Sequence, residues 1–135
     1  MPDFLEAETE ELALEKLHEM GCTDGLPVVI PTQERVERLI LATGLDGDMV
    51  LGEMGPGMGV ATIEKVCVAA VMAGCLPDYM PIVIAAVKAA VQPEFDLREL
   101  QATTHCTAPL IIVNGEARHS CGPVASGSVS YTHLR

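Results

Sequence analysis

The stretch Thr62-Ile63-Glu64-Lys65-Val66-Cys67-Val68-Ala69-Ala70-Val71-Met72-Ala73-Gly74 carries the clearest structural signal in the chain. Apolar or small residues recur three and four positions apart, as on one face of an α-helix, at Ile63, Cys67, Ala70, Val71 and Gly74. Thr62 suits the N-cap of such a helix, and Glu64 falls in its first turn, where negative charge is favoured. The stretch therefore predicts a helix with a continuous apolar face.

Three further helices are predicted around this one. The first covers about 6–20 and stops at Gly21, and the second begins at the N-cap Thr32 and runs to about 43. The last spans about 78–91, where Pro81 is tolerated because it lies in the first turn. Their apolar stripes are Leu14 and Leu17, then Val36, Leu39 and Ile40, then Val83, Ile84, Val87 and Val91.

Short apolar runs predict a few strands between and after the helices. Residues 28–30 suit a short buried strand or an extended segment, and 49–51 suit a short strand. Residues 101–105 suit a strand or an extended loop. Residues 110–113, Leu-Ile-Ile-Val, form the clearest buried strand, and a glycine-rich loop is expected over 52–59. The predicted class is α/β or α+β, with about four helices, a few short strands and an incomplete domain.

Composition excludes several functional classes. The hydrophobic fraction of 49% rules out a disordered chain. The formal net charge of −11 argues against a nucleic-acid partner or an anionic membrane surface, since both require clustered Lys and Arg. The longest apolar run, about 80–91, is broken by Pro81 and Lys88 and is too short for a bilayer.

The cysteine content predicts a reducing compartment. The chain has five Cys, an odd number, no C-x-x-C motif, and no basic, apolar leader at its start. We therefore expect free thiols in the cytoplasm rather than a disulfide framework.

The end of the chain suggests that it is part of something longer. A buried strand at 110–113 needs neighbours on both edges, and the sequence offers few strands before it and none convincing after it. Residues 1–127 are therefore expected to be the N-terminal segment of a larger α/β protein. Residues 128–135 resemble a translated sequencing adaptor of the kind seen in metagenomic proteins, and we exclude them as an artefactual tail. A genuine tail is the alternative.

A first candidate site is the loop Gly55-Pro56-Gly57-Met58-Gly59 leading to Thr62. Backbone N–H groups at Gly57 and Gly59, with the helix start at Thr62, could hold an anionic ligand. The loop lacks both the lysine of a P-loop and the third glycine of a dinucleotide fingerprint. A plain flexible connection is the alternative.

A second candidate is Thr103-Thr104-His105-Cys106. His105 would act as a general acid/base or hydrogen-bond donor, oriented by Thr103 and Thr104. If the segment is extended, His105 and Cys106 point to opposite faces and cannot form a catalytic pair. A structural, hydrogen-bonded histidine is the alternative.

The remaining candidates involve thiols and one turn. Cys121 lies two residues after His119 in a loop that could activate its thiol. Cys67 is expected in the core. Cys75 is expected to pack against the core or to be a second reactive thiol. His105, Cys106, His119 and Cys121 match no zinc spacing, so no metal is predicted, and no cofactor is identified. Asp24 either caps its turn or lines a ligand-binding cleft.

Several motifs in one order resemble a poorly characterised bacterial family associated with the UGSC proteins, which are selenoprotein-like chains with a Sec- or Cys-Gly-Ser-Cys motif. The motifs are Thr23-Asp24-Gly25-Leu26-Pro27-Val28-Val29, Thr62-Ile63-Glu64-Lys65-Val66, Val71-Met72-Ala73-Gly74-Cys75, Gln101-Ala102-Thr103-Thr104-His105 and residues 108–115. The resemblance covers about 23–127 and implies an N-terminal fragment, because family members are longer. The chain departs from the family pattern in lacking a basic residue in 55–59 and in carrying Cys106 and Cys121.

The function implied is that of an enzyme fragment. The complete protein would convert a small, carboxylate-bearing molecule, or carry out thiol-linked redox chemistry with a protein partner bearing a reactive Cys or Sec. The alternatives are a non-catalytic subunit or interaction module, and a truncated chain with no activity of its own.

Overall fold

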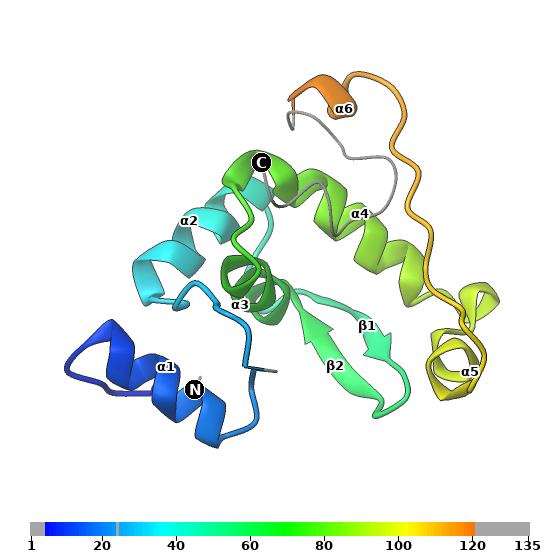
Figure 1. Ribbon diagram of the computed structural model, residues 1–135. Helices are drawn as coiled ribbons and strands as arrows, with labels where there is room; N and C mark the ends of the chain where they lie inside the picture. The colour runs from blue at the N-terminus through cyan, green and yellow to red at the C-terminus, as the bar shows by residue number, and fades with distance from the viewer. Residues whose placement is uncertain (1–4, 24, 121–135) are drawn as a thin grey trace.

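The computed structural model describes residues 5–23 and 25–120 (Figure 1). Its elements in chain order are α1 (Glu10–Glu19), α2 (Gln33–Thr43), β1 (Val50–Met54), β2 (Gly59–Thr62), α3 (Ile63–Met72), η1 (Pro77–Tyr79), α4 (Met80–Ala90), η2 (Pro93–Phe95), α5 (Leu97–Ala102) and α6 (Ala117–Ser120). The two strands form one small antiparallel sheet. The predicted mixed helix-and-strand class is confirmed.

The core lies where α2, α3 and α4 meet. Helix α3 supplies most of it, and its Ile63 and Cys67 are fully shielded from solvent. The other core side chains are Val36 and Leu39 of α2, Val66, Ala70 and Val71 of α3, and Met80 and Ile84 of α4. These side chains are small or aliphatic, so the helices approach closely and dispersion contacts stabilise the layer.

Three helices begin at a threonine whose side chain caps them. The hydroxyl oxygens of Thr9, Thr32 and Thr62 accept the backbone N–H groups of Leu12, Arg35 and Lys65 at 3.2, 3.4 and 3.3 Å. Each bond satisfies one N–H group that the first helical turn leaves without a partner. The predicted caps Thr32 and Thr62 are confirmed, and Gly44 ends α2 in the left-handed region at φ 65°.

The β1–β2 hairpin packs on α4 and α5 through two glycines. A Cβ at Gly52 would lie 2.8 Å from Val91 Cγ2, and one at Gly55 would lie 2.7 Å from Arg98 Cα. Because the second contact is with the backbone of α5, no side chain could be accommodated at Gly55 without moving the hairpin. These glycines allow close approach between elements.

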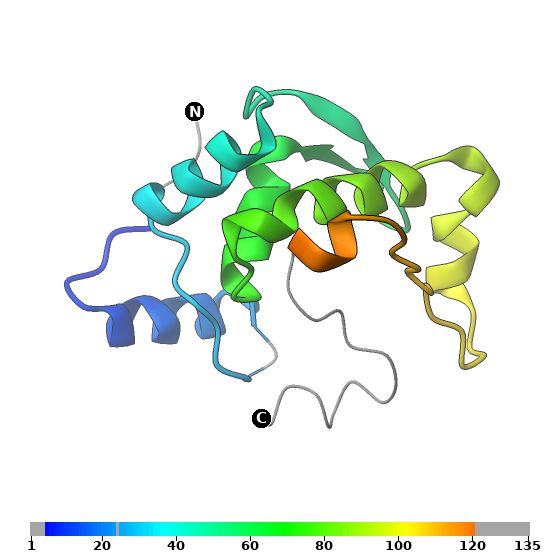
Figure 2. The ribbon, with the colours of Figure 1, turned by 90° about the horizontal axis from the view of Figure 1, so that it is seen from above.

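Helix α1 lies at one end of the molecule and α5 at the other (Figures 1 and 2). Helix α1 has one buried side chain, Ala13. An ion pair joins it to α2, from Arg35 Nη2 to Glu10 Oε1 at 3.0 Å. The following segment is tied to α3 by a backbone bond from Val29 N to Met72 O of 3.2 Å.

Two strand predictions are wrong, and a third segment takes the extended form that was the alternative to a strand. Residues 28–30 are extended without forming a strand, and Val29 is exposed. Residues 101 and 102 belong to α5, which consists of good helix formers and is capped by Asp96 through Glu99 N. Residues 110–113 form no strand, and Leu110, Ile111 and Ile112 are 82%, 60% and 72% exposed, because no described strand lies beside them.

The glycine-rich loop predicted over 52–59 is a β-hairpin. Residues 50–54 pair with 59–62, and the turn is confined to 55–58. The strand predicted at 49–51 is confirmed in β1, which continues to Met54. None of the described helices is long and apolar enough to cross a membrane.

We predict that Leu39→Ala destabilises the protein by about 2–5 kcal/mol, because Leu39 is 1% exposed in the α2–α3–α4 core. Urea unfolding followed by circular dichroism measures the free energy of unfolding. Leu41→Ala is the matched control, since Leu41 lies on the same helix and is 80% exposed, and it should change stability by less than about 0.5 kcal/mol. Equal losses in both variants would contradict the assignment of the core.

Candidate functional site

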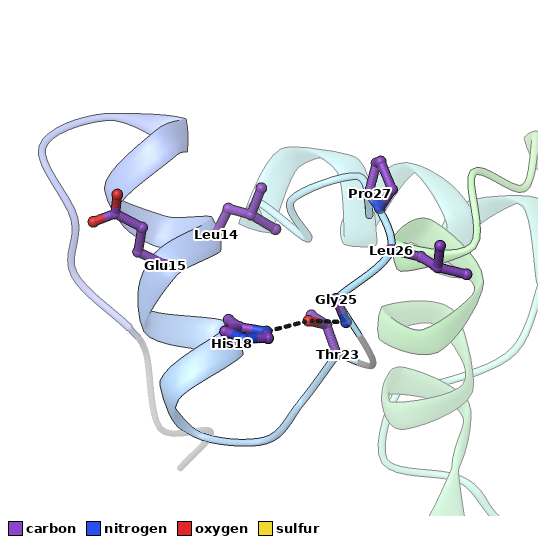
Figure 3. A pocket seen from close by; sticks show the side chains of 7 residues that line it. All are labelled: Leu14, Glu15, His18, Thr23, Gly25, Leu26 and Pro27. Carbon is purple, nitrogen blue, oxygen red and sulfur yellow. Dashed lines mark hydrogen bonds between the residues drawn. The ribbon is translucent and has the colours of Figure 1, made fainter.

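An open groove lies between α1 and the turn that follows it (Figure 3). Its volume is about 300 Å³, and it is lined by Leu14, Glu15, His18, Thr23, Gly25, Leu26 and Pro27. Four of these residues belong to the Thr23–Val29 motif described above. The groove therefore joins that motif to side chains of α1.

The end of α1 determines where the turn lies. Gly21 adopts φ 69°, and its N–H donates to His18 O at 3.0 Å. The N–H of Cys22 donates to Leu17 O at 2.9 Å. This pair of bonds is a Schellman motif, which reverses the chain and brings Thr23 and Gly25–Pro27 back past the last turn of α1. Gly21 is thus the helix stop that the sequence predicted.

His18 and Thr23 form the polar end of the groove. His18 Nδ1 and Thr23 Oγ1 lie 3.4 Å apart, and Thr23 Oγ1 also accepts the backbone N–H of Gly25 at 3.3 Å (Figure 3). The hydroxyl can donate to Nδ1 when Nε2 carries the ring proton, or accept from Nδ1 in the other tautomer. In either tautomer Nε2 is left to form a hydrogen bond with a ligand.

Apolar side chains form the wall of the groove. Leu14 is half-buried, whereas Leu26 and Pro27 are exposed. Glu15 adds a carboxylate at the rim. An apolar wall with a few polar groups at one end is the usual composition of a small-molecule site.

A second, polar hollow of about 410 Å³ is lined by Glu10, Thr32, Glu34, Arg35 and Arg38. Arg35 is occupied here by structural contacts, since Nη2 pairs with Glu10 and Nη1 donates to Ile30 O at 2.9 Å. The exposed ion pair contributes at most about 1 kcal/mol. The hollow is better explained as the junction of α1 and α2 than as a site.

The candidate site around His105 lies on an exposed segment after α5. Thr104, His105 and Cys106 are all exposed. Thr103 Oγ1 accepts the backbone N–H of His105 at 3.2 Å, so it positions the main chain of His105 and not the imidazole. Within residues 5–23 and 25–120, no group of three metal-ligating side chains occurs.

The structure separates the residues of the glycine-loop site. Gly57 lies in the hairpin turn and Gly59 begins β2, whereas Thr62 lies at the other end of β2. The length of β2 puts roughly 10 Å between its two ends. The Thr62 hydroxyl is engaged by Lys65 N. The close approach that requires glycine occurs at Gly52 and Gly55, not at the two glycines proposed for anion binding.

The described cysteines fall into two groups. Cys67 is fully buried and Cys75 is half-buried against the core, as the sequence predicted. Burial raises the pKa of the Cys67 thiol to about 11 and raises the pKa of Cys75 as well. Cys22 and Cys106 are free and exposed. With a raised pKa, the thiols of Cys67 and Cys75 stay protonated and are poor nucleophiles.

Two predicted residues, Asp24 and Cys121, lie outside the described part of the chain. His119 is exposed, and its Nε2 lies 3.1 Å from Arg118 Nε. Sequence reasoning missed His18 altogether. The available signal was that His18 lies four residues after Leu14, so both fall on the same face of a helix that ends just before the Thr23 motif.

Comparisons of the chain with protein-family models, curated proteins and solved structures find no match. The resemblance to the UGSC-associated family stays a prediction.

We predict that stability falls between pH 9 and 11 because of Cys67. The unfolded thiol ionises near its ordinary pKa of 9.0, whereas the buried thiol keeps its proton up to about 11, so the unfolded state binds fewer protons in this window. Urea unfolding should show a loss of about 2 kcal/mol between pH 8 and pH 10.5 that is missing in Cys67→Ala. Lysine and tyrosine titration is common to both proteins, so equal slopes would refute the prediction.

We also predict that His105→Ala leaves the melting temperature nearly unchanged. His105 is exposed, and exposed substitutions change stability by about 0.5 kcal/mol or less. Differential scanning calorimetry provides the measurement, and Thr104→Ala is an exposed control from the same segment. A drop of several degrees in His105→Ala alone would make the imidazole structural.

Proposed function

We propose that the chain supplies a small-molecule-binding groove to an enzyme that converts a small molecule. The observation that carries the proposal is the placement of the His18–Thr23 pair at one end of an apolar wall. His18 would be the general acid/base or the hydrogen-bond donor, and Leu14, Leu26 and Pro27 would contact the apolar body of the ligand.

The size and charge of the groove limit its ligand. A volume of about 300 Å³ lies at the lower end of the range for small-molecule sites, so the ligand is small. The Glu15 carboxylate at the rim and the net charge of −11 oppose a polyanion. They also make a hydroxyl, amide or amine head group a better fit than the carboxylate expected from the sequence.

Thiol-linked redox chemistry, the other function predicted from the sequence, is supported by fewer residues than the groove. Among the described cysteines, Cys22 and Cys106 are the exposed thiols that a Cys- or Sec-bearing partner could reach. Cys22 directly precedes Thr23, so a redox reaction there would occur beside the groove. The cytoplasmic location inferred from the cysteine pattern belongs to the same proposal.

A second candidate function, that of an interaction module, is favoured by one specific observation. Residues 110–112 expose a contiguous run of large apolar side chains. Such a run is typical of a surface that another polypeptide covers.

The groove can be tested by fragment screening against the ¹⁵N-labelled full chain. Fragments that bind there should shift the amide resonances of Thr23, Gly25 and Leu26. His18→Ala should weaken the best such fragment about three- to tenfold, since one net hydrogen bond contributes about 1 kcal/mol.

His105→Ala is the matched control, because His105 is an exposed histidine that does not line the groove. Hits confined to other surfaces would overturn the proposal. So would equal affinities in the two histidine variants.

A further inference from the structure

The segment between α5 and α6 contains an Asn-Gly step, and its Asn114 is the single asparagine of the sequence. Asn114 and Gly115 are both exposed. Gly115 adopts φ 76°, and a Cβ placed on it would meet no heavy atom within 4 Å. Among the described residues, the Gly115 N–H donates to no carbonyl and the Asn114 side chain has no hydrogen-bond partner. Neither packing nor hydrogen bonding therefore holds the Asn114 amide away from the backbone nitrogen of Gly115.

We propose that Asn114 is a site of spontaneous deamidation in the folded chain, with water as the one co-reactant. The backbone nitrogen of Gly115 loses its proton and bonds to Cγ of Asn114, while the C–N bond of the side-chain amide breaks and ammonia leaves. Water then opens the succinimide ring at either carbonyl, which leaves aspartate or isoaspartate at position 114. The reaction transfers no electrons, so it requires no oxidant or reductant.

The mobility expected of this segment favours the ring closure. Residues 108–114 make no backbone hydrogen bond with another described residue. A segment with so few contacts opens at little cost in free energy and samples many conformations. The closure is intramolecular, so its rate depends on how often the two reacting atoms come within reach. Glycine at position 115 helps, because it has no side chain to shield its nitrogen and its backbone is permissive.

Another step of the same kind, Asp46-Gly47, lies in a turn that the fold restrains. The Gly47 carbonyl accepts the N–H of Glu64 at 2.9 Å, and Asp46 Oδ1 accepts the N–H of Asp48 at 3.3 Å. A Cβ at Gly47 would lie 3.4 Å from Ile40 Cδ1, so the turn packs against α2. The chain therefore carries its own comparison between a restrained step and an open one.

Deamidation changes the surface beside the exposed apolar run 110–112. Residues 108–115 carry no charge, and the reaction adds a carboxylate directly after Val113. The isoaspartate product also inserts a methylene into the main chain. The reaction requires neither proposed function, but a polypeptide that covered residues 110–112 would meet a charge that costs free energy to bury.

The test is incubation of the full chain at neutral pH and physiological temperature over days, followed by mass spectrometry of the tryptic peptide 99–118. We expect a mass gain of about 1 Da at position 114, in separable aspartate and isoaspartate forms. The rate should lie within about threefold of the rate in a synthetic peptide of residues 108–118, because the fold does not protect the site.

Two variants test the chemistry. Asn114→Gln should slow the reaction at least about tenfold, because its longer side chain closes a ring less readily. Gly115→Ala should slow it about tenfold, because a Cβ shields the attacking nitrogen and restricts the backbone. Circular dichroism of each variant checks that the fold is retained.

Asp46→Asn is the matched control, because it creates the same dipeptide in the restrained turn and keeps Oδ1 as the acceptor for Asp48. The amide at position 46 should deamidate about tenfold more slowly than Asn114 in the same molecule. The proposal is overturned by no mass gain at position 114, or by a rate there more than about threefold below that of the peptide. Unchanged rates in Asn114→Gln and Gly115→Ala, or a rate at position 46 that equals the rate at 114, would overturn it too.

Discussion

The close packing of α3 between α2 and α4 is the contact on which the rest of the structure depends. Ile63 and Cys67 are fully buried there, and the chain has few aromatic side chains to fill gaps. A core of Ala, Val, Ile, Leu and Met is stabilised by close contact between helix backbones. The hairpin precedes α3 directly, and the C-terminus of α3 holds the segment at Val29. The position of α3 therefore determines where the sheet lies and where the turn that lines the groove lies.

Helices were predictable from the sequence because their signals are local. The threonine caps at Thr32 and Thr62, the stop at Gly21 and the stripe through Ile63 and Cys67 all act within a few residues. Strand predictions were wrong where forming a strand depends on a neighbouring strand to pair with. Residues 110–113 have the composition of a buried strand, but composition does not supply a neighbouring strand.

The candidate sites show the same division. Thr62 was correctly predicted as a cap, but its separation from Gly57 depends on a hairpin that the glycine pattern concealed. His105 stood out by its neighbours in sequence, yet Thr103 bonds to its backbone. His18 did not stand out, because its partner Thr23 comes close only through the Schellman turn after α1. Contacts that form because the chain reverses direction cannot be predicted from hydrophobic periodicity or motif spacing.

The slender attachment of α1 has a consequence for any ligand of the groove. Helix α1 buries one side chain and is joined to α2 by an exposed ion pair. Elements with so few buried contacts open locally at a lower free energy than the core does. Because the groove consists of α1 and its own turn, opening of α1 abolishes it. A ligand would bind only the closed fraction and would in turn hold α1 shut, so recognition and local folding are one coupled equilibrium.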